Sequence, residues 1–393
     1  MTGPLPLSHI RVVDLTRARA GPTIARQFAD WGADVIMVES PKNANELTGG
    51  RHSGDFQNLH RNKRSIVLDL KRDDCHATFL DLVRTADVLL ENYRPDVKYR
   101  LKIDYETLSK VNPRLIYGSV SGFGQDGPNA LRPGVDQVVQ GYGGLMSITG
   151  LPGQGPVRAG IAITDTGTGL YATIGVLTAL VERQLTGKGR WVQTSLLESC
   201  IAMLDAQAAR WLVGKDLPIQ QGNNNPSGTP TGMFETADGY VNLAAGGDKM
   251  FRQFCKLVDR EDLLKDERFK STVARDANRA ILNAEVAKIM KTRPSAEWIK
   301  DCNAADMPCG PIYTIDKMFE DPQVKHLRMT RKVESPALGE VELVSQPIRM
   351  SGLEFNIRTS APELGQHTDE ILTELGYDAA RIDTLRNSLA ADA

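Results

Sequence analysis

Residues 156–171 read PVRAGIAITDTGTGLY, and the rest of the chain is organised around the carboxylate inside this stretch, Asp165. The apolar segment 157–163 before it predicts a buried strand. Apolar residues then recur at helical spacing through 170–181, which predicts a helix that ends near Gly187. The sequence therefore predicts that Asp165 lies at a strand-to-helix corner, where unpaired N–H groups and the helix dipole favour an anion.

The local sequence leaves two interpretations of Asp165 open. Aspartate is a preferred N-cap residue, so most carboxylates in such a position only cap their helix. The alternative is an ionised carboxylate that acts as a nucleophile at the rim of a sheet, and a nucleophile placed here would also cap. Only the rest of the chain decides between the two.

The N-terminal part of the chain alternates between buried strands and amphipathic helices. Strands are predicted at residues 9–15, 34–39, 65–70, 87–92 and 114–120, with a further one at 191–195. Helices are predicted between them, the first starting near Pro22 and ending at Gly32, and a further helix is predicted at 196–212. Repeated strand–helix–strand units predict an α/β domain with a mostly parallel sheet.

The composition and the predicted elements of the sequence change after Leu212. An Asn-, Gly- and Pro-containing stretch to residue 232 predicts a linker, and a strand at 240–245 and several short helices then predict a smaller, α-rich domain. Residues 339–343 and 347–350 predict two short antiparallel strands. A final helix is predicted at residues 365–375.

Composition excludes several classes of ligand. Lys and Arg number 47 against 49 Asp and Glu, without a long basic run, so we expect no nucleic-acid partner. The sequence has neither an apolar stretch of about 18 residues nor a signal-peptide pattern, so we expect no membrane segment and a cytoplasmic location. The five cysteines and six histidines are scattered without ligand spacing, so we expect neither a disulfide framework nor a metal site.

The first strand is followed by a turn that does not fit a nicotinamide dinucleotide. Residues 18–22 read ARAGP, whereas such a site requires glycines in the pattern G-x-G-x-x-G followed by an acidic residue. Glu39 stands where that acid would be, but the glycines are missing. We therefore expect no nicotinamide cofactor.

Many segments, taken together and in order, resemble one family, the class III coenzyme A transferases, with the related α-methylacyl-CoA racemases. Beside the stretch around Asp165, the matching segments are DLTRARAGP (14–22), GADVIMVE (32–39), NKRSIVLDLK (62–71), ADVLLENYRP (86–95), RPGVDQVVQGYGGLMSITG (132–150), DMPCGPI (306–312) and LGQHTDEIL (364–372). Each segment alone is weakly specific, whereas the whole series in register is strongly specific.

The resemblance implies a fold and an assembly. It implies a large Rossmann-like domain built from both ends of the chain, at residues 1–212 and 319–393. A linker at 213–232 would lead into a small inserted domain at 233–318. It also implies a homodimer in which two chains pass through each other as interlocked rings.

The resemblance also implies a reaction: transfer of coenzyme A from an acyl-CoA to a carboxylic acid acceptor such as a small dicarboxylate. Asp165 matches the position of the family's nucleophile, which forms an acyl anhydride and then a thioester with CoA. Asp136, which opens the helix after Gly134, is a secondary candidate near the reacting centre, or only a helix cap.

The implied CoA site lies at the ends of the N-terminal strands, where α/β sheets bind ligands. Its predicted contacts are Arg19, Ala20, Leu68, Lys71, Asn92, Tyr93, Arg94 and Arg100. The cations would meet the phosphates and Tyr93 would pack on adenine. Ser40 departs from several relatives, which carry arginine there, so one contact to CoA is expected to be missing.

Several residues remain open as ligands of the acceptor acid. The candidates are Arg17, Arg19, Arg51, His52 and the loop Asn223–Asn225. In some relatives the loop that matches 223–230 is a run of glycines that covers the reaction intermediates. Here the loop is rich in asparagine, with Gly228 as its one glycine, which weakens the prediction of a lid.

Racemisation of a 2-methylacyl-CoA is the alternative function. It requires two proton-transfer groups on opposite faces of the α-carbon. The racemases that this chain resembles carry Gly-His-Asp at the second acid, whereas this chain reads Gly134-Val135-Asp136. Because valine transfers no proton, the sequence favours the transferase; a CoA-binding protein without catalytic activity is a third reading.

Overall fold

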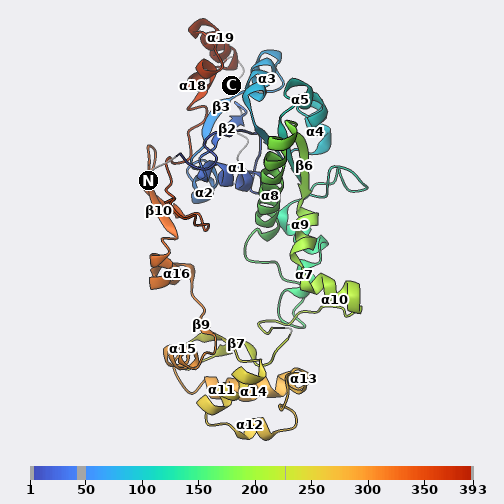
Figure 1. The fold of residues 1–393 in the computed structure, drawn as a ribbon, viewed down its shortest axis with the longest axis vertical. Helices are drawn as coiled ribbons and strands as arrows, with labels where there is room; N and C mark the ends of the chain where they lie inside the picture. Colours follow the sequence, from blue (N-terminus) through green and yellow to red (C-terminus); the bar gives the residue numbers. More distant parts are fainter. Residues whose placement is uncertain (1–3, 42–49, 226, 391–393) are drawn as a thin grey trace. The chain divides into compact units, whose positions relative to one another are not determined.

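The computed structural model describes residues 4–41, 50–225 and 227–390. The chain divides into two compact units (Figure 1). Unit 1 comprises Met1–Leu145, Arg158–Asp216 and Lys325–Ala393, and unit 2 comprises Met146–Val157 and Leu217–Val324. Residues 42–49 lie outside the described residues, and so does Pro226 of the asparagine-rich loop.

Unit 1 is built on a six-stranded sheet of order β3-β2-β1-β4-β5-β6, in which every neighbouring pair is parallel. Its strands are β1 (Arg11–Asp14), β2 (Asp34–Glu39), β3 (Arg64–Val67), β4 (Val88–Glu91), β5 (Ile116–Ser121) and β6 (Arg190–Ser195). The predicted α/β class and parallel sheet are confirmed. This strand order reverses between β1 and β4, and open α/β sheets bind ligands beyond such a point.

Helices cover both faces of this sheet because successive strand residues point to opposite sides. Val12, Val88 and Ile116 join one core, and Val13, Leu89 and Tyr117 join the other. The first core includes residues of α1 (Ala20–Asp30), α6 (Asp136–Tyr142), α8 (Ile163–Thr186) and α9 (Leu196–Met203). The second includes residues of α3 (Asp73–Thr85), α5 (Tyr105–Val111), α18 (Thr368–Glu374) and α19 (Ala379–Ala390).

Shorter elements complete unit 1. They include α2 (Gly54–His60), α4 (Pro95–Arg100), α10 (Ala206–Gly214) and the antiparallel pair β10 (Thr330–Ser335) and β11 (Gly339–Val344). Three short helices lie at or near the sequence positions where the chain passes from one unit to the other. They are α7 (Leu145–Ile148), α16 (Ile315–Glu320) and α17 (Pro322–His326).

Unit 2 has an antiparallel sheet of order β7-β8-β9 and its own apolar core. The strands are β7 (Thr231–Glu235), β8 (Tyr240–Ala244) and β9 (Cys309–Pro311). The helices are α11 (Asp248–Leu257), α12 (Asp262–Lys265), α13 (Thr272–Ala277), α14 (Arg279–Met290) and α15 (Ser295–Ala304).

The predicted strand at residues 157–163 is wrong. The segment forms no strand, and its apolar side chains Val157 and Ile161 are 44% and 60% exposed. Helix α8 begins at Ile163, so Asp165 is the third helical residue rather than a residue at a strand end. An apolar run predicts burial, but here the run supplies exposed surface.

The helix predicted over 170–181 is confirmed as α8, but most of the apolar residues that indicated it are exposed. Leu170, Ile174 and Val181 are exposed and Leu177 packs against the core, whereas Ala172 and Val176 are buried. Small residues allow α8 to pack closely on α1 and the sheet, which the two ribbons in Figure 1 also show.

Three predictions in the second half of the chain also need correction. The partner of β11 is β10, not residues 347–350, which form no strand. The helix predicted from Leu196 to Leu212 is broken into α9 and α10 because Asp205 adopts a left-handed φ of 43°. The C-terminal helix starts at Thr368, and α19 follows it.

Candidate active site

The Asp165 carboxylate lies in the first turn of the long helix α8. Within the described ranges its side chain accepts no hydrogen bond, and the N-cap of α8 is Ala162, so Asp165 does not cap the helix. Its side chain is largely, though not fully, buried. Burial and the nearby Asp136 carboxylate raise the pKa of Asp165 to about 6, while the Arg19 guanidinium opposes that rise.

Asp136 is buried, and its carboxylate is fully engaged. It accepts hydrogen bonds from the backbone N–H (2.9 Å) and hydroxyl (2.7 Å) of Thr164 and from Nε2 of Gln140 (2.6 Å). Gln140 in turn accepts the N–H of Ala159 at 2.8 Å. The N-cap of α6 is Val135, so Asp136 does not cap its own helix; it caps the first turn of α8 from a neighbouring helix.

The first turn of α8 has one available backbone donor. The N–H groups of Ile163, Thr164 and Thr166 donate to Ile161, Asp136 and Ala162. In the part of the chain that the structure describes, the N–H of Asp165 has no acceptor. An oxyanion formed beside this carboxylate would therefore find a free donor at the positive end of the helix dipole.

Arg19 lies at the N-cap of α1, the helix that packs on α8. Its Nη2 donates to Oδ2 of Asp55 on α2 at 2.7 Å, and the side chain is about one-third exposed. A Cβ atom added to Gly169 of α8 would lie 2.7 Å from the Thr23 side chain. The N-terminal turns of α1 and α8 are therefore in direct contact.

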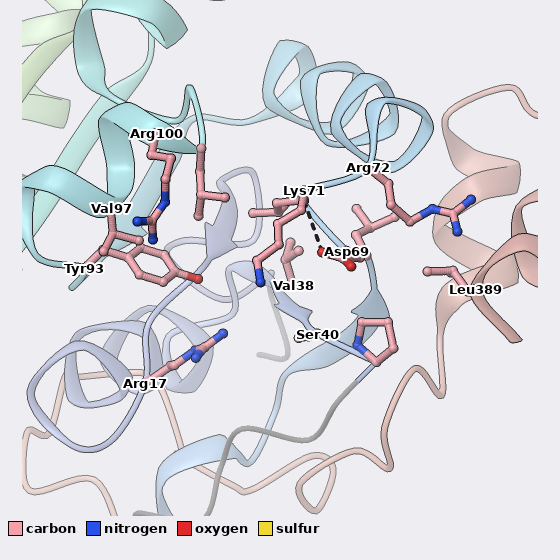
Figure 2. Close-up of a pocket in the computed structure, with 14 residues that line it drawn as sticks. Arg17, Val38, Ser40, Asp69, Lys71, Arg72, Tyr93, Val97, Arg100 and Leu389 are labelled. Atoms are coloured by element: carbon pink, nitrogen blue, oxygen red, sulfur yellow. Dashed lines mark hydrogen bonds between the residues drawn. The ribbon is translucent and has the colours of Figure 1, made fainter. Parts of the chain in front are cut away.

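A pocket of about 530 Å³ lies at the carboxyl ends of the strands, near the point where strand order reverses (Figure 2). Figure 2 shows Arg17, Lys71 and Arg100 around a space beside the Tyr93 ring, whereas Arg72 extends toward Leu389. The side chains of Lys71 and Arg100 make no hydrogen bond within the described residues, so their charges are available to a phosphate ligand.

The predicted CoA contacts fall into two groups in the structure. Leu68, Lys71, Tyr93 and Arg100 line the pocket, and so does Ser40. The others are not part of its lining: Arg19, Ala20, Asn92 and Arg94.

Asn92 does not line the pocket but holds the backbone of Arg17, which does. Its Oδ1 accepts the N–H of Arg17 at 2.9 Å and its Nδ2 donates to the Arg17 carbonyl at 2.7 Å. The Arg17 guanidinium lies 5.6 Å from the centre of the Tyr93 ring. Sequence reasoning placed Arg17 among the acceptor ligands and did not select it for the CoA pocket; its position three residues beyond β1 was the available signal.

Buried ion pairs hold the turns that carry these residues. Asp14 at the end of β1 accepts from Lys63 Nζ (3.0 Å) and from the N–H and hydroxyl of Thr16. Glu91 at the end of β4 accepts the N–H of Tyr93 at 2.8 Å. Because both carboxylates lie at the ends of adjacent strands, they fix the two turns that frame the pocket.

Other residues considered for the site are engaged elsewhere. Arg51 donates to Glu39 (2.7 Å) and to the carbonyl of Pro362, and His52 pairs with Glu363 at 2.9 Å. In the described residues no group of three or more His, Cys, Asp or Glu side chains could hold a metal ion. No helix of the described parts is long and apolar enough to cross a membrane.

Known proteins match the chain over nearly its whole length. The profile of CoA-transferase family III matches residues 7–368. The succinate–glutarate CoA-transferase of Agrobacterium fabrum is 38% identical over 387 residues, covering 94% of this chain and 96% of that protein. Human succinyl-CoA:glutarate CoA-transferase is 33% identical over 394 residues, covering 98% and 90%.

A solved structure agrees with these matches. The crystal structure of a CaiB/BaiF family protein from Brucella suis superposes with a TM-score of 0.85 at 35% identity, covering 95% of this chain and all of that one. The resemblance stated from the sequence is thus confirmed: the chain belongs to CoA-transferase family III and is an enzyme that transfers coenzyme A.

Proposed function

We propose that the enzyme moves CoA from an acyl-CoA to a carboxylic acid through covalent intermediates on Asp165. The observation that carries the proposal is the carboxylate itself: it is partly buried, without a hydrogen-bond partner in the described residues, and in the first turn of α8 beside Asp136 and Arg19. A carboxylate needs no general base to act as a nucleophile. With a pKa of about 6 it is mostly ionised at neutral pH.

The proposed reaction has four acyl transfers that leave the enzyme unchanged. An oxygen of Asp165 attacks the thioester carbonyl, the C–S bond breaks, and CoA leaves as a thiolate from a mixed anhydride. The thiolate attacks the aspartyl carbonyl, which releases the donor acid and forms an aspartyl-CoA thioester. The acceptor carboxylate then attacks that carbonyl to give a second anhydride, and the thiolate attacks its acyl carbonyl to form the new acyl-CoA.

The surroundings of Asp165 support these steps. Each attack forms a tetrahedral oxyanion, and the unpaired N–H of Asp165 lies next to the reacting group. Asp136 holds the first turn of α8 in place through Thr164 while its negative charge keeps Asp165 a better nucleophile than an ordinary aspartate. Asp136 is therefore proposed as a positioning residue.

The pocket at the ends of β1 and β4 is proposed to hold the nucleotide part of CoA. Lys71 and Arg100 would bind its phosphates, Arg17 would add a third cation, and the Tyr93 ring offers a surface for adenine. Asn92 acts indirectly, through the Arg17 backbone. Arg94, which pairs with Asp96 at 3.6 Å, and Ala20 are the weakest members of the predicted set.

Small dicarboxylic acids are the proposed substrates. The similar proteins from Agrobacterium fabrum and Homo sapiens are named for succinate or succinyl-CoA and glutarate, and one from Haloarcula marismortui for succinyl-CoA and mesaconate. The racemase alternative gains no support, because Val135, 61% exposed, stands beside Asp136 where a proton-transfer group would be needed.

A homodimer is the proposed assembly, with the two chains interlocked and with domains at 1–212 plus 319–393 and at 233–318. Support comes from large apolar side chains exposed on α8 and α10. They are Leu170, Tyr171, Ile174, Val181, Leu185, Trp211, Leu212 and Val213. Large exposed apolar patches on folded chains commonly mark interfaces. A cytoplasmic location remains a proposal.

The substitution Asp165→Ala tests the proposed nucleophile. We expect CoA exchange between succinyl-CoA and glutarate to fall at least about 1,000-fold, because the covalent route is lost. Binding of CoA, measured by calorimetry, should change little, since the pocket at β1 and β4 keeps its lining. Retained turnover in Asp165→Ala would exclude an aspartyl intermediate.

A further inference from the structure

Two arginines flank Ala18 in the turn after β1, and the turn directs them to different places. Arg17 lines the CoA pocket and lies over the Tyr93 ring. Arg19 is not part of that lining and pairs with Asp55 instead. Ala18 between them has a left-handed φ of 61°, and the Asn92 side chain accepts the N–H of Arg17 and donates to the Arg17 carbonyl. The two cations therefore belong to different sites.

The packing of α1 against α8 brings Arg19 close to Asp165. Thr23 is one helical turn after Arg19 on α1, and Gly169 is one turn after Asp165 on α8. These two following residues touch, with the Thr23 side chain 2.7 Å from a Cβ position at Gly169 and the Ala20 carbonyl 2.9 Å from it. Arg19 is also the one cation that acts on the Asp165 carboxylate among the described residues.

Several N–H donors of the Arg19 guanidinium have no acceptor within the described residues. A guanidinium carries five N–H donors, and only Nη2 of Arg19 has an acceptor in the described residues, the Asp55 carboxylate. That contact fixes the side chain while leaving its other N–H groups open to a ligand. By contrast, Arg51 and His52 are held by Glu39 and Glu363. The asparagines 223–225 belong to unit 2.

Charge decides which substrate needs this arginine. The site already contains the carboxylates of Asp165 and Asp136, so a substrate with a second carboxylate brings a further negative charge toward them. A monocarboxylic acid of the same length brings only the carboxylate that reacts. A planar, partly anchored guanidinium offers the fork that a carboxylate prefers.

Building on the CoA transfer proposed above, we propose that Arg19 is the specificity-determining residue that binds the second, non-reacting carboxylate of a dicarboxylic substrate beside Asp165. Asp55 holds the guanidinium in position for this contact. Arg17, two residues earlier, serves the CoA pocket and takes no part in the choice of acid.

The test compares glutarate with pentanoate, which has the same chain length but a methyl group in place of the second carboxylate. With succinyl-CoA as donor, kcat/KM for the acceptor reports only the second half of a double displacement. Assays at pH 8 lie well above the pKa of about 6 of Asp165 in the wild type, and any rise in that pKa on loss of the Arg19 charge affects both acids alike and cancels in their ratio. In Arg19→Gln we expect kcat/KM for glutarate to fall about 10- to 100-fold and that for pentanoate to stay within about 3-fold.

Two further variants make the test specific. Arg19→Lys keeps a charge next to Asp55 but lacks the fork, so the preference for glutarate should be intermediate. Arg17→Gln should raise KM for succinyl-CoA and leave the ratio of glutarate to pentanoate unchanged.

Three results would overturn the assignment. They are a wild-type enzyme without preference for glutarate, an unchanged ratio in Arg19→Gln, and an equal loss with both acids. Each leaves CoA transfer through Asp165 intact, whereas retained turnover in Asp165→Ala removes that mechanism itself; the two failures are thus distinguishable.

Discussion

Asp165 and Asp136 are two carboxylates in one site, and their hydrogen bonds divide their roles. Asp136 receives three hydrogen bonds and fixes the start of α8, while Asp165 receives none in the described residues. A buried carboxylate without partners is costly to ionise, so the fold tolerates an unfavourable charge at the place where chemistry is proposed. Nucleophiles commonly reduce stability in this way.

The cost of this charge predicts a stability difference for Asp165→Asn. The pKa of Asp165 is about 6 in the folded chain and 3.8 as its ordinary value. Below about pH 4 the side chain is neutral in both states, so the variant and the wild type should unfold alike. Between about pH 4 and 6 the unfolded wild type releases its proton while the folded chain keeps it, so the free energy of unfolding falls as the pH rises. Above that range Asp165→Asn should be more stable by about 2–3 kcal/mol.

Denaturant titrations at pH 4 and pH 8 measure this difference. Asp383→Asn, which removes an exposed carboxylate on α19, serves as the matched control for the loss of one negative charge. An equal free energy of unfolding for Asp165→Asn and wild type at pH 8 would mean that Asp165 is not strained by burial.

At the residue scale, sequence reasoning could select Asp165 but not its surroundings. The motif around Asp165 is local, so resemblance identifies it. The bond from Thr164 to Asp136 joins two helices, and no spacing rule predicts it. The separation of Arg17 from Arg19 depends on a left-handed Ala18, and alanine gives no signal for that conformation.

The elements that frame the site differ in how well their sequences predict them. The strands of the parallel sheet were predicted because sheets covered on both faces contain nearly continuous apolar residues. Helix α8 was predicted from its apolar spacing, but Leu170, Ile174 and Val181 of that series are exposed. Hydrophobic periodicity identifies a helix but does not show which of its apolar residues are buried.

The close contact between α8 and α1 predicts that Gly169→Ala is destabilising. Alanine normally favours a helix over glycine by about 1 kcal/mol. Here the added methyl group would lie 2.7 Å from Thr23 and 2.9 Å from the Ala20 carbonyl, so the helices must separate, at a net cost of about 1–3 kcal/mol. Activity should fall too, since Arg19 would shift from Asp165.

Thermal unfolding measures the effect, with Gly214→Ala as control. Gly214 ends α10, and a Cβ atom there would meet nothing within 4 Å, so its replacement should be neutral or stabilising. A Gly169→Ala protein as stable as Gly214→Ala would contradict the tight packing of α1 against α8.

At the scale of the whole molecule, α8 and α10 expose large apolar side chains, among them Ile174, Val181 and Val213. The strand order of unit 1 was within reach of the sequence, because short right-handed crossovers restrict the topology. The interlocked assembly was not, because periodicity within one chain contains no information on how two chains pass each other. It remains a proposal from resemblance.

This surface predicts that Ile174→Glu weakens the proposed dimer. Ile174 is 61% exposed in the single chain, and a carboxylate buried at an apolar interface costs several kcal/mol. Sedimentation should show a dimer for wild type and a shift toward monomer for Ile174→Glu. Thr384→Glu, on the exposed side of α19, introduces the same charge and should stay dimeric. A wild-type monomer would contradict the proposal.

Mass spectrometry of the enzyme after incubation with succinyl-CoA tests the central claim most directly. If Asp165 carries the acyl group and then CoA, the peptide that contains it should gain the mass of CoA, and hydroxylamine should convert this adduct to a hydroxamate on Asp165. The Asp165→Ala protein should give neither product. Rapid CoA exchange by wild type without any adduct on this peptide would contradict the account.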